Sequence, residues 1–213
     1  MNRSKFGFTL IELLIVVAII AILAAIAVPN FLEAQVRAKV SRCKADMRTT
    51  LTALEAYAVV NNTYPPMGDM GTPNPNVAAQ GFHSRVPNYL TTPIAFMTSI
   101  TLDPFVNQKS TWWDTIYPIQ TQVGKRYVYY NTVLLTTVVY TDVWGGLVNW
   151  VGAHLIYGYG PDQDPFNHPN QGNDTLMPYD STNGTISFGN IIRCQKMTDG
   201  VPVHPTTGTY IWP

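Results

Sequence analysis

The chain has 213 residues, of which 46% are hydrophobic and only 12% are charged, and its thirteen basic and thirteen acidic side chains cancel. A length of this order fits one compact domain with an additional element. A net charge of zero argues against nucleic-acid binding, because neutralising phosphates requires a basic surplus. It favours self-association instead, since little like-charge repulsion keeps the molecules apart.

The cysteines limit the metal and redox chemistry of the chain. Cys43 and Cys194 are its only two cysteines, too few for a four-thiolate zinc site, and no two histidines have the spacing that would complete a mixed site. A disulfide between the cysteines is one alternative if the domain is exported. The other is that Cys43 is an apolar residue of a helix, which the pattern around it favours.

Residues 1–7 form a targeting segment with two basic side chains and no acidic one. Gly7 precedes the hydrophobic run, so cleavage there would leave that run on the mature protein, unlike cleavage of an ordinary secretory signal. Residues 8–32 contain a single charge, Glu12. As a helix they would extend about 37 Å, enough to cross a hydrocarbon core of about 30 Å. The sequence therefore predicts a membrane span.

Glu12 is the unusual residue of this span. A carboxylate in a membrane costs about 2.5–3.5 kcal/mol near the bilayer centre and less near an end, so such an acid points to a function. The segment offers Glu12 no evident partner, and we therefore expect one on another molecule.

The residues GFTLIE at 7–12, the apolar run behind them and Pro29 resemble the signature of type IV prepilins and type II secretion pseudopilins. The resemblance implies that a prepilin peptidase cuts after Gly7 and N-methylates Phe8. It also implies that Glu12 pairs with the terminal amine of a neighbouring subunit. Breaking such a buried pair costs about 3–5 kcal/mol, so the pair would set the register of a growing polymer.

Three features of the following helix can be read from spacing. Ala18, Ala21 and Ala25 either let helices approach closely or simply fill the span. Pro29 predicts a kink or local melting, because proline cannot donate to the carbonyl four residues earlier. An apolar stripe at steps of three and four predicts an amphipathic helix; it comprises Leu32, Val36, Val40, Cys43, Met47, Leu51, Leu54 and Ala58. Asn61 and Asn62, before two prolines, predict its end.

Basic residues lie mostly off this stripe, between positions 37 and 48. They would contact anionic lipid or acidic faces of neighbouring subunits, or would form an ordinary solvated face. They also make the far side of the span more basic than the leader, which conflicts with the positive-inside rule. The processing that the resemblance implies places the leader in the cytoplasm, and we give that implication precedence.

The remaining residues predict a head rich in strands. Val, Ile, Tyr and Thr dominate residues 126–141, 153–159 and 185–193, with Gly and Asn between these runs. A short helix is also expected at 92–101. The predicted fold class is α+β, with a long N-terminal helix packed on an antiparallel sheet.

Parts of the head narrow the resemblance to the major pseudopilin of type II secretion, the G subunit. These parts are Ala56-Tyr57, residues 62–65, Leu102-Asp103-Pro104-Phe105 and the run LIYGYGPD at 155–162. Phe105 departs from the tryptophan that is usual there, and the head is longer than usual. An extracellular pilin for adhesion or motility is therefore an alternative.

The same resemblance implies a calcium-binding loop near the C-terminus. Asp162, Asp164 and Asp174, with Asn167 and Asn173, supply the oxygen ligands that calcium prefers. Their spacing is not that of an EF-hand, and a polar loop rich in turn residues is the alternative. No other cofactor is expected.

An enzyme is not expected, because no nucleophile motif accompanies the scattered histidines, His83, His154, His168 and His204. Tryptophans of the head could stack on a ligand, which would make the chain a membrane-anchored binding module, although core or interface packing is the favoured role. These are Trp112, Trp113, Trp144 and Trp150.

The sequence thus divides into a leader at 1–7, a transmembrane and filament-core helix at 8–32, an amphipathic helix at 33–62 and a head at 63–213. We expect a structural filament subunit, most like a type II secretion pseudopilin, that begins as a precursor in the bacterial inner membrane with its head outside the cytoplasm. Its assembled form would be periplasmic or extracellular. The partners implied are other copies, minor pilins or pseudopilins, the peptidase, membrane lipid, and an assembly platform with an ATPase.

Overall fold

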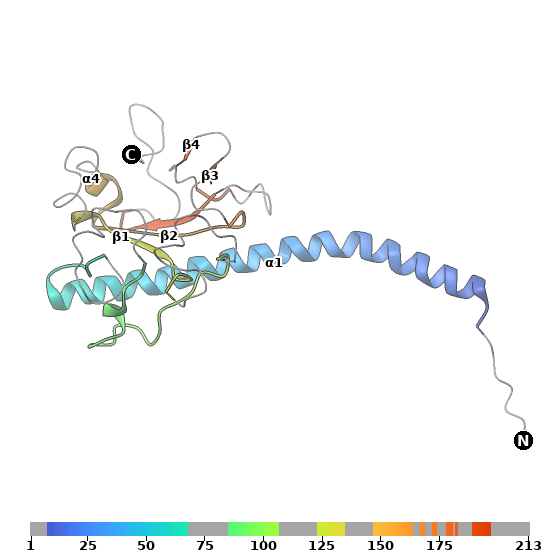
Figure 1. Cartoon of the computed structure of the whole chain (residues 1–213), viewed down its shortest axis with the longest axis horizontal. Coiled ribbons are helices and arrows are strands. Elements are labelled where there is room, and N and C mark those ends of the chain that lie inside the picture. The colour runs from blue at the N-terminus through green and yellow to red at the C-terminus, as the bar shows by residue number, and fades with distance from the viewer. Residues whose placement is uncertain are drawn as a thin grey trace, which may run out of the picture.

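A computed structural model describes residues 8–67, 85–106, 123–134, 147–163, 167–168, 172–173, 178–180, 182 and 189–196. One long helix, α1 (Leu10–Asn61), dominates it with 52 residues. Its N-terminal half projects away from the head, and its C-terminal half lies against the head (Figure 1). At about 1.5 Å per residue the helix is about 78 Å long.

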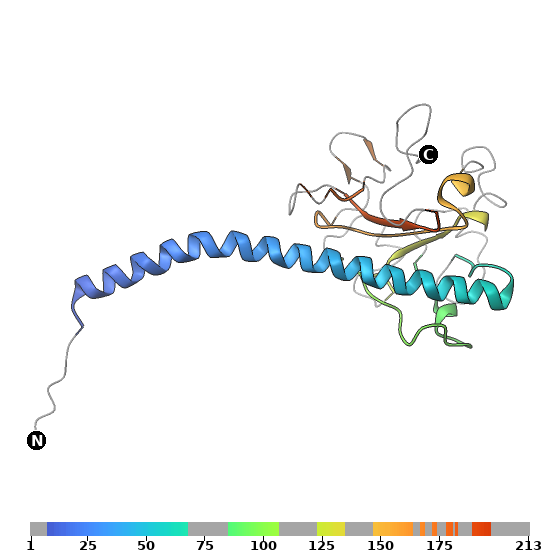
Figure 2. The same cartoon turned by 180° about the vertical axis from the view of Figure 1, so that it is seen from behind.

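The ends of α1 follow from local sequence. Thr9 is the N-cap, and Asn62 is the C-cap with a left-handed φ of 55°. Asparagine tolerates this conformation better than most residues, so the predicted end of the helix is confirmed. The helix runs unbroken through Pro29 and curves gently (Figure 2), so the predicted local melting at this position does not occur.

The head contains an antiparallel sheet in the order β1–β2–β5. Its strands are β1 (Val128–Asn131), β2 (His154–Gly158) and β5 (Ile191–Cys194). Tyr129 lies opposite Ile156, and Ile156 lies opposite Arg193. The predicted α+β class is therefore confirmed. Each predicted run of strand residues overlaps one strand, but the strands are shorter than the runs.

Smaller elements complete the described part of the head. They are the 3-10 helix η1 (Asn88–Leu90), the helix α4 (Leu147–Val151) and the hairpin of β3 (Asn167–His168) with β4 (Gly172–Asn173). The short helix predicted at 92–101 is wrong, because this segment forms turns and bends instead. The backbone N–H groups of Phe96 and Met97 both donate to the carbonyl of Leu90, which folds the segment back on itself.

The core forms where the predicted stripe of α1 meets the sheet. Val40, Cys43, Met47 and Leu54 are buried, whereas Leu32 at the start of the stripe is 52% exposed. Tyr127 and Tyr129 are buried on the helix side and donate to Asp46 Oδ2 and to the carbonyl of Pro65. Tyr130 and Tyr157, which alternate to the opposite face, are also buried, with 6.0 Å between their ring centres.

The part of the segment 85–106 around η1 lies on the other side of α1 from the sheet in both views (Figures 1 and 2). The ends of the segment return to the sheet side, where Arg85 pairs with Val128 and Leu102 with Arg126. The head therefore contacts the helix from two sides.

Candidate functional site at the start of the long helix

Glu12 and Thr9 form a reciprocal cap at the first turn of α1. The Thr9 N–H and Oγ1 donate to Glu12 Oε2 at 2.8 and 2.6 Å, and the Glu12 N–H donates to Thr9 Oγ1 at 3.4 Å. The expectation that Glu12 has no partner within its segment is therefore wrong. A helix leaves its first N–H groups unsatisfied, and a threonine followed by glutamate three residues later satisfies two of them.

The cap with Thr9 uses only one of the two carboxylate oxygens of Glu12. Both bonds from Thr9 reach Oε2, and Glu12 Oε1 accepts no hydrogen bond from the described residues. A cationic group of another molecule can approach Oε1 without displacing Thr9. The spacing Thr9-x-x-Glu12 is that of a capping box, so the sequence itself carries the signal for this hydroxyl partner.

The surface around this cap is apolar and uncovered. The large hydrophobic side chains from Phe8 to Leu32 are 44–76% exposed, and the most apolar window of α1 has no buried residue. The helix is long and apolar enough to cross a membrane by length and composition. Ala18, Ala21 and Ala25 are exposed as well. Phe8 is 73% exposed, whereas Gly7 lies outside the described residues.

The head is fixed to the far end of α1 by a polar cluster. Tyr64 Oη donates to Glu55 Oε2 at 2.8 Å, and Gln195 Nε2 donates to Tyr64 Oη at 2.8 Å. The His154 ring lies 5.0 Å from the Tyr64 ring, and its Nδ1 is 3.9 Å from Glu55 Oε1. Burial lowers the pKa of His154 to about 4, although the Glu55 carboxylate opposes this shift.

A second polar group, Asp103, ties three segments together inside the head. Its carboxylate accepts the backbone N–H groups of Phe105 at 2.9 Å and Tyr159 at 2.8 Å, and Cys43 Sγ lies 3.8 Å away. Burial raises the pKa of Asp103, and the two backbone donors oppose that rise. The two pseudopilin-like runs around Asp103 and Tyr159 thus meet at one carboxylate, a contact that their separation in sequence did not reveal.

Gly158 shows how closely these segments approach. A Cβ atom at this position would lie 2.9 Å from Asp103 Oδ2 and 3.1 Å from the Tyr127 ring. Arg85, which is also buried, donates from Nη2 to Tyr159 Oη at 2.6 Å. This cluster fixes the position of the sheet on α1, and among the described residues the buried Nε of Arg85 has no hydrogen-bond partner.

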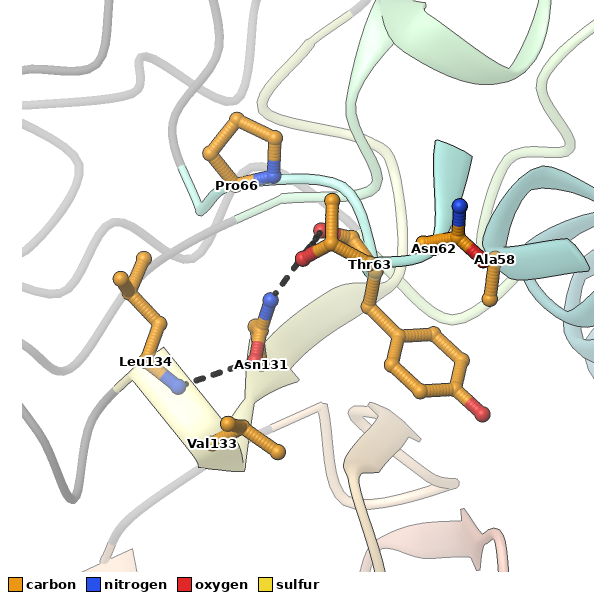
Figure 3. Close-up of a pocket in the computed structure, with 8 residues that line it drawn as sticks. Ala58, Asn62, Thr63, Pro66, Asn131, Val133 and Leu134 are labelled. Carbon is orange, nitrogen blue, oxygen red and sulfur yellow. Dashed lines mark hydrogen bonds between the residues drawn. The ribbon is translucent and has the colours of Figure 1, made fainter. Parts of the chain in front are cut away.

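A pocket of about 590 Å³ lies beside the turn that follows α1 (Figure 3). Asn131 stands at its wall and donates to the carbonyls of Tyr64 and Pro65, and it accepts the N–H of Leu134. The rest of the described lining combines one amide and one hydroxyl with apolar side chains: Ala58, Asn62, Thr63, Pro66 and Val133. Among the described residues, the lining contains no carboxylate, imidazole or thiol that could perform acid–base or nucleophilic chemistry.

The predicted calcium ligands are mostly outside the described residues. Asp162 lies in a turn after β2 and is partly buried, whereas Asp164 and Asp174 are not described. The backbones of Asn167 and Asn173 pair in the β3–β4 hairpin. Within the described part of the chain, no three His, Cys, Asp or Glu residues gather at one point. The calcium site stays a prediction.

Of the other sequence predictions, some concern residues that the structure describes and some do not. Cys43 and Cys194 are both buried and are not joined in a disulfide, and Cys43 packs in the core as an apolar helix residue should. Of the four histidines, only the side chain of His154 is described. The side chains of the four tryptophans considered as a ligand-stacking surface lie outside the description.

Residues 2–28 match the prokaryotic N-terminal methylation motif. The chain is 52% identical over 63 residues to the type IV major pilin protein PilA of Myxococcus xanthus, covering 30% of the chain and 29% of that pilin. It is 50% identical over 62 residues to the major component of the type IV wide pilus of Thermus thermophilus, covering 29% of the chain and 47% of the relative.

A secretion protein matches over a similar length. Type II secretion system core protein G of Pseudomonas aeruginosa is 42% identical over 64 residues, covering 30% of the chain and 45% of the relative. The chain thus spans less than half the length of each of these relatives, and no solved structure matches it significantly. The methylation motif coincides with the exposed apolar half of α1, and this helix continues into a head built on an antiparallel sheet, so the N-terminal part of the chain is type IV pilin-like.

Proposed function

We propose that the protein is a structural subunit that polymerises into a type IV pilus-like filament. The observation that carries this proposal is the apolar half of α1, whose large side chains stay 44–76% exposed in the single chain. Removing each exposed side chain of this size from water is favourable by roughly 1.5–3 kcal/mol of free energy. Lipid would cover this surface before assembly, and other copies would cover it in the filament. Pilins and pseudopilins are structural subunits and not enzymes, and the same role is proposed here.

The residues at the start of α1 support a series of processing and assembly steps that would lead to this filament. A prepilin peptidase would cut after Gly7 and N-methylate Phe8, and the precursor would wait in the bacterial inner membrane with its head outside the cytoplasm. Glu12 would then receive the terminal amine of a neighbouring copy at Oε1. An inner-membrane assembly platform with an ATPase, together with minor pilins or pseudopilins, would complete the machinery.

The filament is proposed to be a type II secretion pseudopilus that helps to export folded proteins. The Pseudomonas relative supports this choice, as do the pseudopilin-like runs that meet at Asp103. The Myxococcus and Thermus relatives favour the second candidate, an extracellular pilus for adhesion or motility. Deleting the gene should abolish secretion of folded proteins in the first case and remove surface filaments in the second.

Calcium binding is proposed as an accessory property of the head. Three aspartates, Asp162, Asp164 and Asp174, lie within thirteen positions of one another, and bringing them together without a cation would set like charges against each other. The ion would bind these residues and hold the loop to the sheet.

Glu12→Leu tests the proposed assembly. The variant should enter the membrane at least as well as the natural chain, because it removes a charge from the span, but filament formation should fail or slow markedly. Assembly is followed by electron microscopy and by sedimentation of the filaments. Glu33→Leu removes one carboxylate from a half-buried position outside the span, where it pairs with Arg37, and is the matched control. Normal filaments from Glu12→Leu would contradict the role of this carboxylate, and a natural chain that forms no filaments would instead favour a membrane-anchored binding module.

Gly7→Leu tests the processing step separately. Mass spectrometry of the natural chain from membranes should find a mature terminus at N-methyl-Phe8, and the variant should retain residues 1–7. An intact Met1 terminus on assembled natural protein would contradict the proposal.

A further inference from the structure

The part of α1 that directly follows the predicted span carries a surplus of positive charge. Between positions 33 and 42 there are three cations and one acid, Glu33, whereas between positions 43 and 61 two cations and two acids balance. The surplus is therefore confined to the ten helix residues nearest the span. We call its three cations the basic collar; they are Arg37, Lys39 and Arg42.

The collar residues are exposed. The side chains of Arg37 and Arg42 are 66% and 67% exposed, although Arg37 pairs with Glu33 and Arg42 Nε lies 3.6 Å from Asp46 Oδ2. Lys39 is exposed as well. A guanidinium has five N–H donors, so an exposed arginine in such a pair can still bind a further anion.

The collar surrounds the helix and does not form a stripe along it. At about 100° per residue, Lys39 lies about 200° and Arg42 about 140° around the axis from Arg37. The remaining sector holds Val36 and Val40, which pack against the head. A neighbour lying alongside α1 would require cations on one face, whereas a layer of lipid head groups surrounds a helix that passes through it. The arrangement therefore fits a membrane surface.

The collar also lies at the height of that surface. Arg37, Lys39 and Arg42 are about 7.5, 10.5 and 15 Å beyond Leu32 along the axis. Helical side chains tilt toward the N-terminus, so these charges lie nearer the membrane than their backbone does. The polar layer adds about 5–7 Å to each side of the hydrocarbon core, and its potential extends about 8 Å farther at physiological ionic strength. Arg48, about 24 Å beyond Leu32, is out of reach.

Lys39 connects the collar to the head. Its Nζ lies 5.8 Å from the centre of the Phe105 ring, and the Phe105 N–H donates to the carboxylate of Asp103. The collar is thus at the edge where the head begins. A contact that holds the collar at the membrane surface would also hold the head at a fixed height outside it.

We propose that the basic collar binds the phosphates of anionic phospholipids on the face of the membrane where the head lies, and so sets the depth of α1 before assembly. The inference rests on the proposed membrane precursor and names the class of lipid that it contacts. Each cation close to an anionic surface strengthens the attraction about fivefold. Entry into a filament would exchange these contacts for contacts with other copies.

Lipid selectivity of the full chain tests the collar. The reference chain carries Arg3→Gln and Lys5→Gln, which removes the cations on the other side of the span. It is inserted in phosphatidylcholine vesicles that contain a trace of spin-labelled phosphatidylglycerol or phosphatidylcholine, and electron spin resonance measures how much of each label the protein holds. The reference chain should prefer phosphatidylglycerol at least about fivefold, and this preference should decline as salt is raised.

Two variants of the reference chain remove equal charge at different heights. Arg37→Gln with Lys39→Gln should lower the preference below about twofold, because these two cations lie nearest the membrane. Arg48→Gln with Lys196→Gln should leave it unchanged. Lys196 follows Gln195, whose side chain bonds to Glu55 near the far end of α1, so it lies well outside the polar layer.

The outcomes distinguish the collar from the precursor and from the filament. A reference chain without lipid preference overturns the collar, as does equal loss in both variants or retention of the preference in the collar variant. If the collar variant keeps the lipid preference but forms less sedimenting filament, the cations serve a neighbouring copy and the collar is again overturned. A chain that alkaline carbonate washes from the vesicles is not inserted, which overturns the membrane precursor and the collar together.

Discussion

Single residues decide how α1 begins and how the head is held to it. Thr9 and Glu12 satisfy each other at the first turn, and Asn62 ends the helix in a left-handed conformation. Both features depend on neighbours within four residues, so the sequence signals them. Asp103 and His154 differ, because they also meet partners that lie 56 to 99 residues away along the chain, at Tyr159, Cys43 and Glu55.

Thr9→Val should loosen the first turn of α1. The substitution keeps the shape of the side chain and removes the hydroxyl that caps Glu12, and the loss of a cap costs about 1 kcal/mol. The protection of the Glu12 amide against hydrogen exchange, measured by NMR in micelles, should therefore fall about fivefold. Thr9→Ser retains the hydroxyl and should retain the protection. Equal exchange in the natural chain and Thr9→Val would contradict the cap.

His154 should make the head less stable in acid. Its pKa is about 4 in the folded chain against 6.5 for an ordinary histidine, so between these pH values the unfolded chain binds more protons. Stability is then fully present above pH 6.5 and falls as the pH drops toward 4, by up to about 3 kcal/mol. Thermal melting of the full chain in detergent at a series of pH values measures this slope. His154→Phe keeps a ring against Tyr64 and should flatten the dependence of stability on pH. An unchanged dependence in this variant would mean that other groups cause it.

At the scale of elements, the two halves of α1 differ in what covers them. The stripe predicted from its spacing is buried from Val40 to Leu54, and the preceding apolar half is exposed on all sides. Helical spacing is enough to predict such a stripe, because it depends only on the period of the helix. The segment 92–101 was not predictable in this way, since its turns are fixed by bonds to Leu90 and by the contact of Tyr57 with Phe96, 5.4 Å between ring centres.

Leu54→Ala should destabilise the head by about 2–5 kcal/mol, because a fully buried leucine leaves a cavity when it is truncated. Val59→Ala, on the same helix but at a side chain that is 80% exposed, should change stability by less than about 0.5 kcal/mol. Chemical denaturation of the full chain in detergent measures both. Similar losses for the two variants would mean that the stripe does not pack on the sheet.

For the molecule as a whole, the sequence predicted the order of helix and strands better than it predicted which distant segments contact one another. A long helix followed by strands was expected from composition and period alone, and the antiparallel sheet agrees. The order β1–β2–β5 and the meeting of residues 103 and 159 at one carboxylate were not predictable, because they depend on contacts between distant segments. The candidate site was half predicted: the acid was identified, and its threonine partner was missed.

Calcium should raise the melting temperature of the chain if the loop of Asp162, Asp164 and Asp174 binds it. A ligand that binds only the folded state stabilises it by about 2.7 kcal/mol at a hundredfold excess over its dissociation constant. The full chain in detergent should therefore melt higher in millimolar calcium than with chelator at matched ionic strength, and Asp162→Ala should abolish the difference. Identical curves for the natural chain would reduce the loop to an ordinary turn.

The placement of α1 between the sheet and the turns around η1 has a mechanical consequence. A pull along a filament would load each helix lengthwise, parallel to the layers on either side of it. Several contacts between helix and head are spaced along this direction; they involve Val40, Met47 and Leu54 and the hydrogen bonds of Asp103 and Glu55. Under shear these contacts would share the load and would not break one after another. The head should consequently stay attached to its stem under tension, and extension of the filament should begin between subunits or in the helix before the head.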